Sequence, residues 1–230
     1  MPLSRQGWEG PVSRTNHESG DLPGFYLPAF RGRGWGLCHL ETPTSLRGGV
    51  FCVGESKVEQ GLIQVYTGEG KGKTTAATGL AVRALGQGFR VLLVRFLKPQ
   101  EPASGEILFL QGTPGLEILT AGVGIIGRPV DPPVVARSVV ATFERARQRM
   151  AEEKFDLLIL DEINNVLHRG FLPLEEFLAF LDGRPAGLEI VLTGRNAPEA
   201  VLERAHLVTR MTAEKHPLQQ GIPARRGIEF

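Results

Sequence analysis

The sequence predicts an α/β fold in which a mostly parallel, six-stranded sheet carries helices on both faces. Three observations support this prediction. Short apolar runs alternate with helical patterns, most of these runs are nearly continuous in apolar residues, and a glycine-rich stretch joins the first run to the first helix. Near-continuous apolar strands are typical of sheets that helices cover on both faces. A regular alternation of strand and helix favours parallel strands.

The apolar runs and the helical stripes give the expected elements in order. The six strands are predicted at 62–66, 91–97, 116–119, 155–160, 188–192 and 207–211. One amphipathic helix is predicted from apolar residues at three- and four-residue steps, namely Val135, Val139, Phe143, Ala146 and Met150. A second follows from Leu174, Phe177, Leu178 and Leu181. Because ligands of such sheets bind beyond the carboxyl ends of the strands, we expect the functional residues there.

The chain changes character near Gln60. Residues 1–60 are rich in Gly, Pro, Ser and Arg and show no sustained period of 2 or 3.6. We therefore expect an irregular or disordered N-terminal extension over 1–60, followed by one folded domain over 61–230. A translation start further along the chain, near Val58, is the alternative reading of the same segment.

Composition narrows the class of protein. The 230 residues carry a formal net charge of +1, which gives no electrostatic argument for a nucleic-acid or membrane partner. No apolar run approaches the roughly 20 residues of a spanning helix, and the N-terminus lacks the apolar region of a secretory signal. We therefore expect a cytoplasmic protein. The two cysteines, Cys38 and Cys52, are expected to be reduced thiols, and a thiolate metal site is not expected.

The strongest motif is TGEGKGKTT at 67–75, between the first strand and the first helix. Its glycines allow backbone N–H groups to point inward, and the helix N-terminus adds positive charge, so the motif predicts a phosphate site. Lys73 is expected to reach phosphate oxygens, and Thr74 to place its hydroxyl on Mg²⁺. Thr67 stands where G-x-x-x-x-G-K-[ST] has its first glycine, and Gly68 comes one residue later. The loop is therefore a variant P-loop.

Charged residues follow three other predicted strands. Asp161 and Glu162 end the fourth strand, where an acid beside a P-loop commonly holds Mg²⁺, and the sequence leaves open which acid is the direct ligand. Arg195 follows the fifth strand and is expected to contact phosphate. Lys98 follows the second strand with a weaker claim to the same role.

Several segments in this order resemble one family. They are TGEGKGKTTAATGLAVRALGQG, LLILDEIN, VLTGRNAPE and the closing GIPARRGIEF, and they resemble the cobalamin adenosyltransferases of the CobA/CobO/BtuR family over about residues 61–230. The resemblance implies a RecA-like P-loop fold and a homodimer. It also implies an enzyme that transfers the 5′-deoxyadenosyl group of ATP to the Co(I) of a corrinoid (cobalamin or cobyrinic acid a,c-diamide). Triphosphate is released, in adenosylcobalamin biosynthesis or salvage.

The resemblance also implies roles for individual residues. It assigns the triphosphate cradle to Gly68, Gly70, Lys71, Gly72, Lys73, Thr74 and Thr75, and we expect Thr67 and Glu69 to belong to the same nucleotide-binding loop. It makes Thr74 and Glu162 contacts of Mg²⁺ (or Mn²⁺). Lys73 and Arg195 then act catalytically by stabilising the departing triphosphate. No nucleophilic side chain is required, because Co(I) itself attacks the ribose C5′.

Two departures from the family pattern lead to further hypotheses. Glu69 replaces the usual Asn and adds a negative charge near the phosphates. Val123 and Ile125 stand at the corrinoid-binding positions where members that act on complete cobalamin carry Phe and Trp. We therefore expect either an incomplete corrinoid as substrate or a supply of Co(I) that is already reduced, with a flavoprotein reductase as a candidate partner.

Two rival functions remain at this stage. One is a P-loop kinase for a small metabolite, which would release ADP instead of triphosphate. The other is an ATP-binding corrinoid carrier or regulator without catalysis. A RecA-like nucleic-acid motor is disfavoured by the near-neutral charge.

Overall fold

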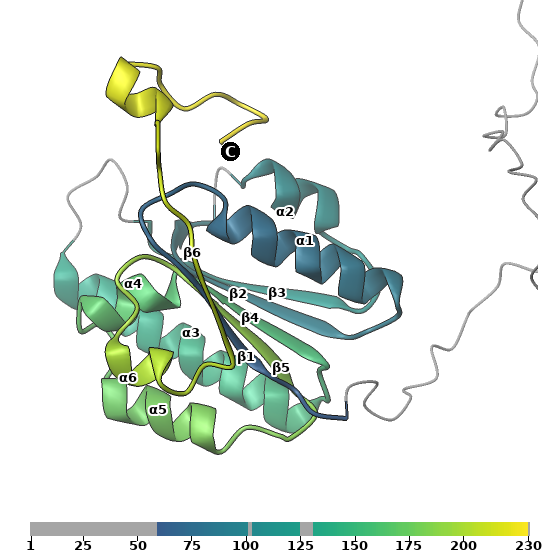
Figure 1. Cartoon of the computed structure of the whole chain (residues 1–230). Helices are drawn as coiled ribbons and strands as arrows, with labels where there is room; N and C mark the ends of the chain where they lie inside the picture. Colours follow the sequence, from purple (N-terminus) through teal and green to yellow (C-terminus); the bar gives the residue numbers. More distant parts are fainter. Residues whose placement is uncertain (1–58, 101–102, 125–130, 230) are drawn as a thin grey trace, which may run out of the picture. The chain divides into compact units, whose positions relative to one another are not determined.

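The computed structural model describes residues 59–100, 103–124 and 131–229, which lie in the second of two units of the chain, Cys52–Phe230. Six strands form one sheet in the order β3-β2-β4-β5-β1-β6 (Figure 1). They are β1 (Ile63–Thr67), β2 (Val91–Pro99), β3 (Leu116–Gly122), β4 (Leu157–Asp161), β5 (Glu189–Thr193) and β6 (Leu207–Arg210). Every pair of neighbouring strands in this described part is parallel, which confirms the predicted class. The predicted domain boundary at residue 60 stays a prediction.

Helices cover both faces of the sheet, as expected. They are α1 (Lys73–Gly86), α2 (Gly105–Leu110), α3 (Pro132–Glu152), α4 (Ile163–His168), α5 (Leu174–Asp182) and α6 (Glu199–Leu202), with a 3-10 turn η1 (Pro217–Gln220). α1 and α2 lie on one face and α3 to α6 on the other (Figure 1). Within the described residues, no helix is both long and apolar enough to cross a membrane.

The central strands supply both cores because successive side chains point to opposite faces. On β4, Leu158 and Leu160 join the core under α3 to α6, whereas Leu157 and Ile159 join the core under α1. The small side chains that α1 turns to the sheet are Ala77, Ala81 and Ala84. They let the helix lie close to the strands, which brings its N-terminus to the carboxyl end of β1.

The predicted stripe on α3 is the face that packs on the sheet. Its first four residues, Val135, Val139, Phe143 and Ala146, are buried, and Met150 is partly buried. The ring of Phe143 meets that of Phe180 edge-on, with centroids 5.2 Å apart, and so joins α3 to α5. α3 and α5 thus cover the sheet face opposite α1. The carboxyl ends of the strands are left free for a ligand.

Candidate functional site

The glycine-rich loop leaves β1 at Thr67 and enters α1 at Lys73. Gly68 and Gly72 have φ values of 96° and 116°, which favour glycine. A Cβ at Gly68 would lie 2.5 Å from the carbonyl oxygen of Met211, and one at Gly70 would lie 2.6 Å from that of Thr212. The backbone N–H of Gly70 donates to the Met211 oxygen at 2.7 Å. The glycines therefore also meet a steric demand from the segment after β6, which the sequence alone did not reveal.

Lys73 lies across this loop. Its ammonium donates to the carbonyl oxygens of Gly68 at 2.6 Å and Gly70 at 2.7 Å. Burial lowers the pKa of Lys73, and the nearby Arg195 lowers it further. The ammonium is thus held within the turn of the loop, where an incoming phosphate would offer it stronger, charged acceptors.

A buried polar cluster links the loop to β4 and β5. Asp161 is 1% exposed, and its Oδ1 accepts from the hydroxyls of Thr74 at 2.8 Å and Thr193 at 2.7 Å. Its Oδ2 accepts from the ammonium of Lys98 at 2.5 Å, and the same ammonium lies 3.1 Å from Thr74 Oγ1. The first residue of α1 after Lys73 is therefore tied to the end of β4.

The adjacent acids Asp161 and Glu162 lie in different environments. Glu162 has a φ of 68° and its backbone N–H donates to Thr193 Oγ1 at 2.9 Å. Its carboxylate accepts from Asn165 Nδ2 at 2.5 Å and lines the open cavities in front of the loop. Asp161 is therefore the buried acid beside Thr74, and Glu162 is the acid that faces open space.

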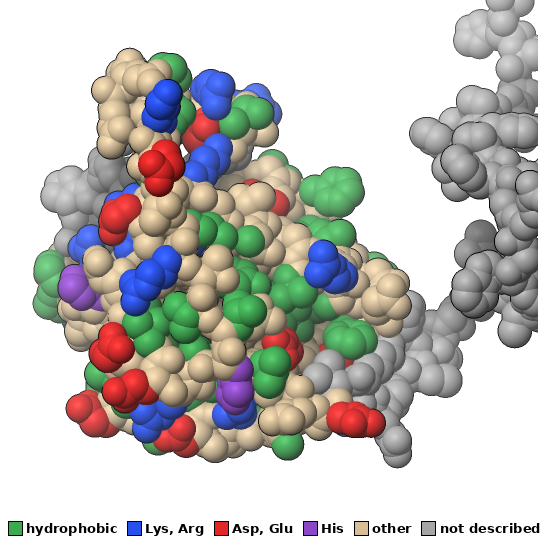
Figure 2. Space-filling model, viewed as in Figure 1, with side chains coloured by type: hydrophobic (Ala, Val, Ile, Leu, Met, Phe, Trp, Pro, Cys, Tyr) green, Lys and Arg blue, Asp and Glu red, His purple; other side chains and the backbone are tan. Residues whose placement is uncertain are grey.

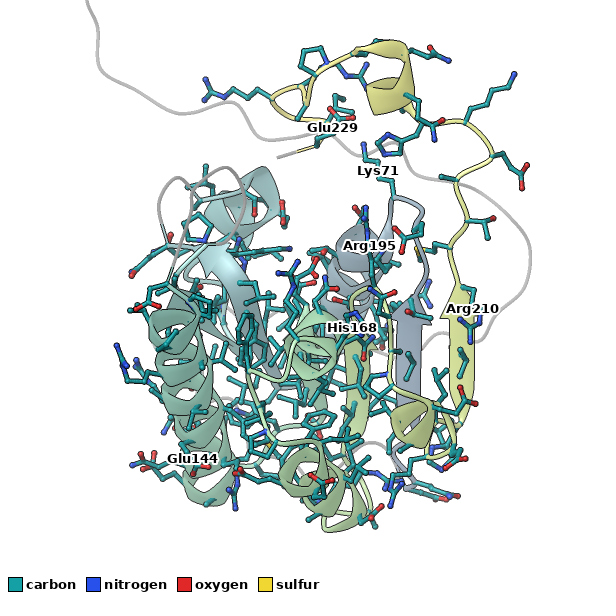
Figure 3. All side chains as sticks on the ribbon, turned by 90° about the vertical axis from the view of Figure 1, so that its left-hand side faces the viewer. Lys71, Glu144, His168, Arg195, Arg210 and Glu229 are labelled. Atoms are coloured by element: carbon teal, nitrogen blue, oxygen red, sulfur yellow. The ribbon has the colours of Figure 1, made fainter. Side chains whose placement is uncertain are left out.

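Arg195 and Glu69 pair with each other across the opening. Their Nη1 and Oε2 atoms are 2.9 Å apart, and both side chains are more than half exposed. Figure 3 shows Arg195 at the carboxyl end of the strands, below Lys71 of the loop. In this structure the negative charge of Glu69 is thus paired with the positive charge of Arg195.

The C-terminal segment lies over the loop. Lys71 Nζ donates to the Ile228 carbonyl at 3.0 Å and to Glu229 Oε1 at 2.9 Å, and Figure 3 shows Lys71 and Glu229 facing each other. Hydrogen bonds from Arg225 and Lys71 lower the pKa of Glu229 to about 2. Basic side chains gather around this segment on the face in Figure 2. Sequence reasoning missed Glu229, for which the closing GIPARRGIEF gave the available signal.

Among the predicted site residues, residues 69–75, Glu162 and Arg195 meet at one cavity, whereas Thr67 is buried and Gly68 does not line it. Its volume is about 280 Å³, and its lining is Glu69, Gly70, Lys71, Gly72, Lys73, Thr74, Thr75, Glu162, Arg195, His216, Ile228 and Glu229. A neighbouring cavity of about 550 Å³ shares Glu69, Glu162 and Arg195 and adds Lys98 and His168. Val123 does not line either cavity but packs, partly buried, against the core beside β3. Ile125 lies outside the described residues.

The oxygens near Thr74 suit a hard divalent cation. Within the described residues, no group of three or more His, Cys, Asp or Glu side chains forms a metal cage. Mg²⁺ does not require one, because it commonly takes one or two carboxylates together with phosphate and water oxygens. The Lys98 ammonium already rests on Thr74 and Asp161, so these oxygens accept a cation. The donor set therefore fits Mg²⁺ or Mn²⁺.

The fold and the loop together define the class of protein: a P-loop nucleotide-binding α/β protein. The chain belongs to the ATP:corrinoid adenosyltransferase family BtuR/CobO/CobP, whose family description matches residues 59–230. This match confirms the resemblance to the CobA/CobO/BtuR family.

Relatives of known name agree with this assignment. The chain is 34% identical over 178 residues to a corrinoid adenosyltransferase of Pseudomonas aeruginosa. The matched region covers 77% of this chain and 88% of that protein. It is 33% identical over 178 residues to the corrinoid adenosyltransferase CobA of Salmonella typhimurium, with 77% and 90% covered. A corrinoid adenosyltransferase of Sinorhizobium sp is 36% identical over 175 residues, with 75% and 81% covered.

Proposed function

We propose that this protein transfers the 5′-deoxyadenosyl group of ATP to the Co(I) of a corrinoid and releases triphosphate. In this reaction the electron pair of Co(I) forms the Co–C5′ bond, the C5′–O bond breaks, and its electrons leave with triphosphate. The observation that carries the proposal is a variant phosphate loop, with Lys73 held inside it, in a chain whose family acts as ATP:corrinoid adenosyltransferases. The function lies in adenosylcobalamin biosynthesis or salvage.

The residues around the loop would bind ATP and stabilise its leaving group. The loop would offer backbone N–H groups other than that of Gly70, which donates to Met211, and Lys73 begins the helix whose N-terminus would face the triphosphate. Lys73 and Arg195 place positive charge where triphosphate accumulates negative charge. Holding the cobalt in line with C5′ can contribute about 7–11 kcal/mol to lowering the barrier.

We further propose a divalent cation, Mg²⁺ or Mn²⁺, at the oxygens of Thr74 and the acids of β4. When bound, the cation would neutralise charge on the triphosphate. Thr74 and Glu162 face the cavity that would hold the phosphates, so they are the candidates for direct contact. Asp161 is buried behind Thr74 and would orient its hydroxyl.

Two positions of the sequence bear on the choice of corrinoid. Val123 and Ile125 offer no aromatic side chain to displace a lower ligand of cobalt. We propose an incomplete corrinoid without that ligand, or Co(I) reduced beforehand by a partner such as a flavoprotein reductase. Equal turnover of Co(II)alamin with a reductase and of pre-reduced cobalamin would contradict the second option.

We also propose a homodimer in the cytoplasm, where ATP is available. Leu108 and Phe109 on α2 are 63% and 84% exposed and provide apolar surface for a second subunit. Light scattering of the purified chain would test the dimer, and a monomer at micromolar concentration would contradict it.

The decisive assay is product analysis in the dark under anaerobic conditions. Protein, ATP, Mg²⁺ and chemically reduced cob(I)alamin should give a light-sensitive adenosylated corrinoid. An incomplete corrinoid should be assayed in parallel, because Val123 and Ile125 bear on that choice. Formation of ADP would favour the kinase instead, and ATP binding without any product from either corrinoid would favour the carrier.

A further inference from the structure

We propose that Lys98 competes with the divalent cation for the hydroxyl oxygen of Thr74, which Asp161 orients, and so couples metal binding to the arrival of triphosphate. This inference rests on the proposed nucleotide and metal site. It makes Lys98 a positioning residue that acts through Thr74 and Asp161.

One contact of Lys98 is the Thr74 oxygen that a metal would use, and the other is Asp161, the acid that orients this hydroxyl. Its Nζ lies 2.5 Å from Asp161 Oδ2 and 3.1 Å from Thr74 Oγ1. The Lys98 side chain is 21% exposed and that of Asp161 is 1% exposed. A carboxylate this deeply buried needs a compensating charge, and Lys98 is its ion-pair partner among the residues that the structure describes.

The remaining bonds of the cluster prevent the two cations from sharing the site. The Thr74 hydroxyl donates to Asp161 Oδ1, which also accepts from Thr193. The hydroxyl hydrogen is therefore committed, and Lys98 occupies one of the two lone pairs of Thr74 Oγ1, so a metal ion on the other would lie next to the ammonium. Two cations this close together repel strongly. Metal binding at Thr74 consequently requires the ammonium to move away.

The surroundings give Lys98 a place to go. It lies between the cavity of about 550 Å³, which contains Arg195, and a second cavity of about 730 Å³ on the α1 side. The preceding residue, Leu97, is buried with a φ of 55°, and the β2–β3 register shifts between Arg95 and Pro99. The flexible side chain of Lys98 at this bend can leave Asp161 and contact phosphate oxygens instead. The triphosphate would thus draw Lys98 away from the Thr74 oxygen that the metal needs.

The test is Mn²⁺ binding to the full-length protein in the absence of nucleotide, measured by EPR of the free ion. We expect Lys98→Met to bind Mn²⁺ at least about tenfold more tightly than wild type, because the competing cation is gone. Lys154→Met is the matched control, since it removes an exposed lysine before β4 at the opposite end of the sheet and should leave the affinity unchanged. A purely structural role for Lys98 predicts unchanged or weaker binding.

A second titration separates this inference from the proposed function. In wild type, Mn²⁺ should strengthen the binding of ATP measured by equilibrium dialysis, and in Lys98→Met this strengthening should be smaller. If wild type binds ATP equally with and without Mn²⁺, the metal site and the role of Lys98 both fail. If wild type shows the effect but Lys98→Met binds Mn²⁺ like wild type without nucleotide, only the role of Lys98 is overturned. Lys98→Gln gives the same test should the methionine variant fold poorly.

Discussion

The two ends of the same sheet differ in how some of their charged side chains are partnered. At the amino end, Arg149 pairs with Glu117 at 2.8 Å and with Glu152 at 2.5 Å on the surface. At the carboxyl end, Asp161 is buried and Lys73 is held by backbone carbonyls. Surface pairs contribute little to stability and need no ligand. Buried charges satisfied in part by carbonyls are typical of a site arranged for another partner.

Backbone strain follows the same division. In the described residues, the non-glycine positions with positive φ are Leu97, Glu162 and Asn196. They lie at the carboxyl ends of β2, β4 and β5, and all three line the cavity of about 550 Å³. Strain of this kind persists where the surrounding structure supports it, and it clusters at functional sites. One end of the sheet therefore serves stability and the other serves ligand binding.

The largest expected effect is on Lys73. Lys73→Ala should lower the rate of adenosylcorrinoid formation by at least about 10²–10³, because a charge aimed at the leaving group is lost. Arg149→Ala, at the amino end, should leave that rate unchanged. Single-turnover kinetics measured by corrinoid absorbance would compare the two. A rate for Lys73→Ala within tenfold of wild type would contradict the assignment of ligand binding to the carboxyl end of the sheet.

The next effect separates the two acids of β4. Asp161→Ala should lower the free energy of unfolding by about 3 kcal/mol, because it leaves Lys98 without its ion pair. Glu162→Ala should change stability much less, since this side chain lies at the cavity, but it should weaken metal-dependent ATP binding. Urea denaturation measures the first effect. Adding Lys98→Met to Asp161→Ala should recover part of the loss, and equal losses in the two single variants would contradict the assignment.

A pH dependence follows from the lowered pKa of Lys73. In the free protein, the Lys73 ammonium loses its proton at a pH below the ordinary lysine pKa of 10.5. Bound triphosphate would favour the charged form. ATP binding should therefore take up a proton between the lowered pKa and 10.5, and calorimetry in buffers of different ionisation enthalpy would detect it. The unfolded chain binds more protons in this window, so stability should gain from this group as the pH rises through it. Proton release on ATP binding would contradict this.

The smallest expected effect concerns Glu69. Glu69→Gln removes a negative charge near the triphosphate and frees Arg195, so ATP affinity should rise by up to about fivefold, the range of an exposed ion pair. The difference should shrink in high salt because both groups are exposed. Unchanged or weaker binding at low salt would show that Glu69 serves to orient Arg195.

Much of the fold and of the loop could be predicted because the relevant signals are local. The apolar runs gave the strands, and the spacing of Gly72, Lys73 and Thr74 placed the loop at the start of α1. The adjacent acids could not be separated from the sequence, because their directions depend on the positive φ of Glu162. The contact between Lys71 and Glu229 joins positions 158 residues apart, and no local pattern reports such a pairing.

The proposed reaction cleaves ATP at C5′ and not between its phosphates. The most direct measurement is ³¹P NMR of a dark, anaerobic reaction with ATP, Mg²⁺ and a chemically reduced corrinoid, read together with the corrinoid spectrum. We expect triphosphate in equal amount to the adenosylated corrinoid and no ADP. ADP with an unchanged corrinoid spectrum would contradict it.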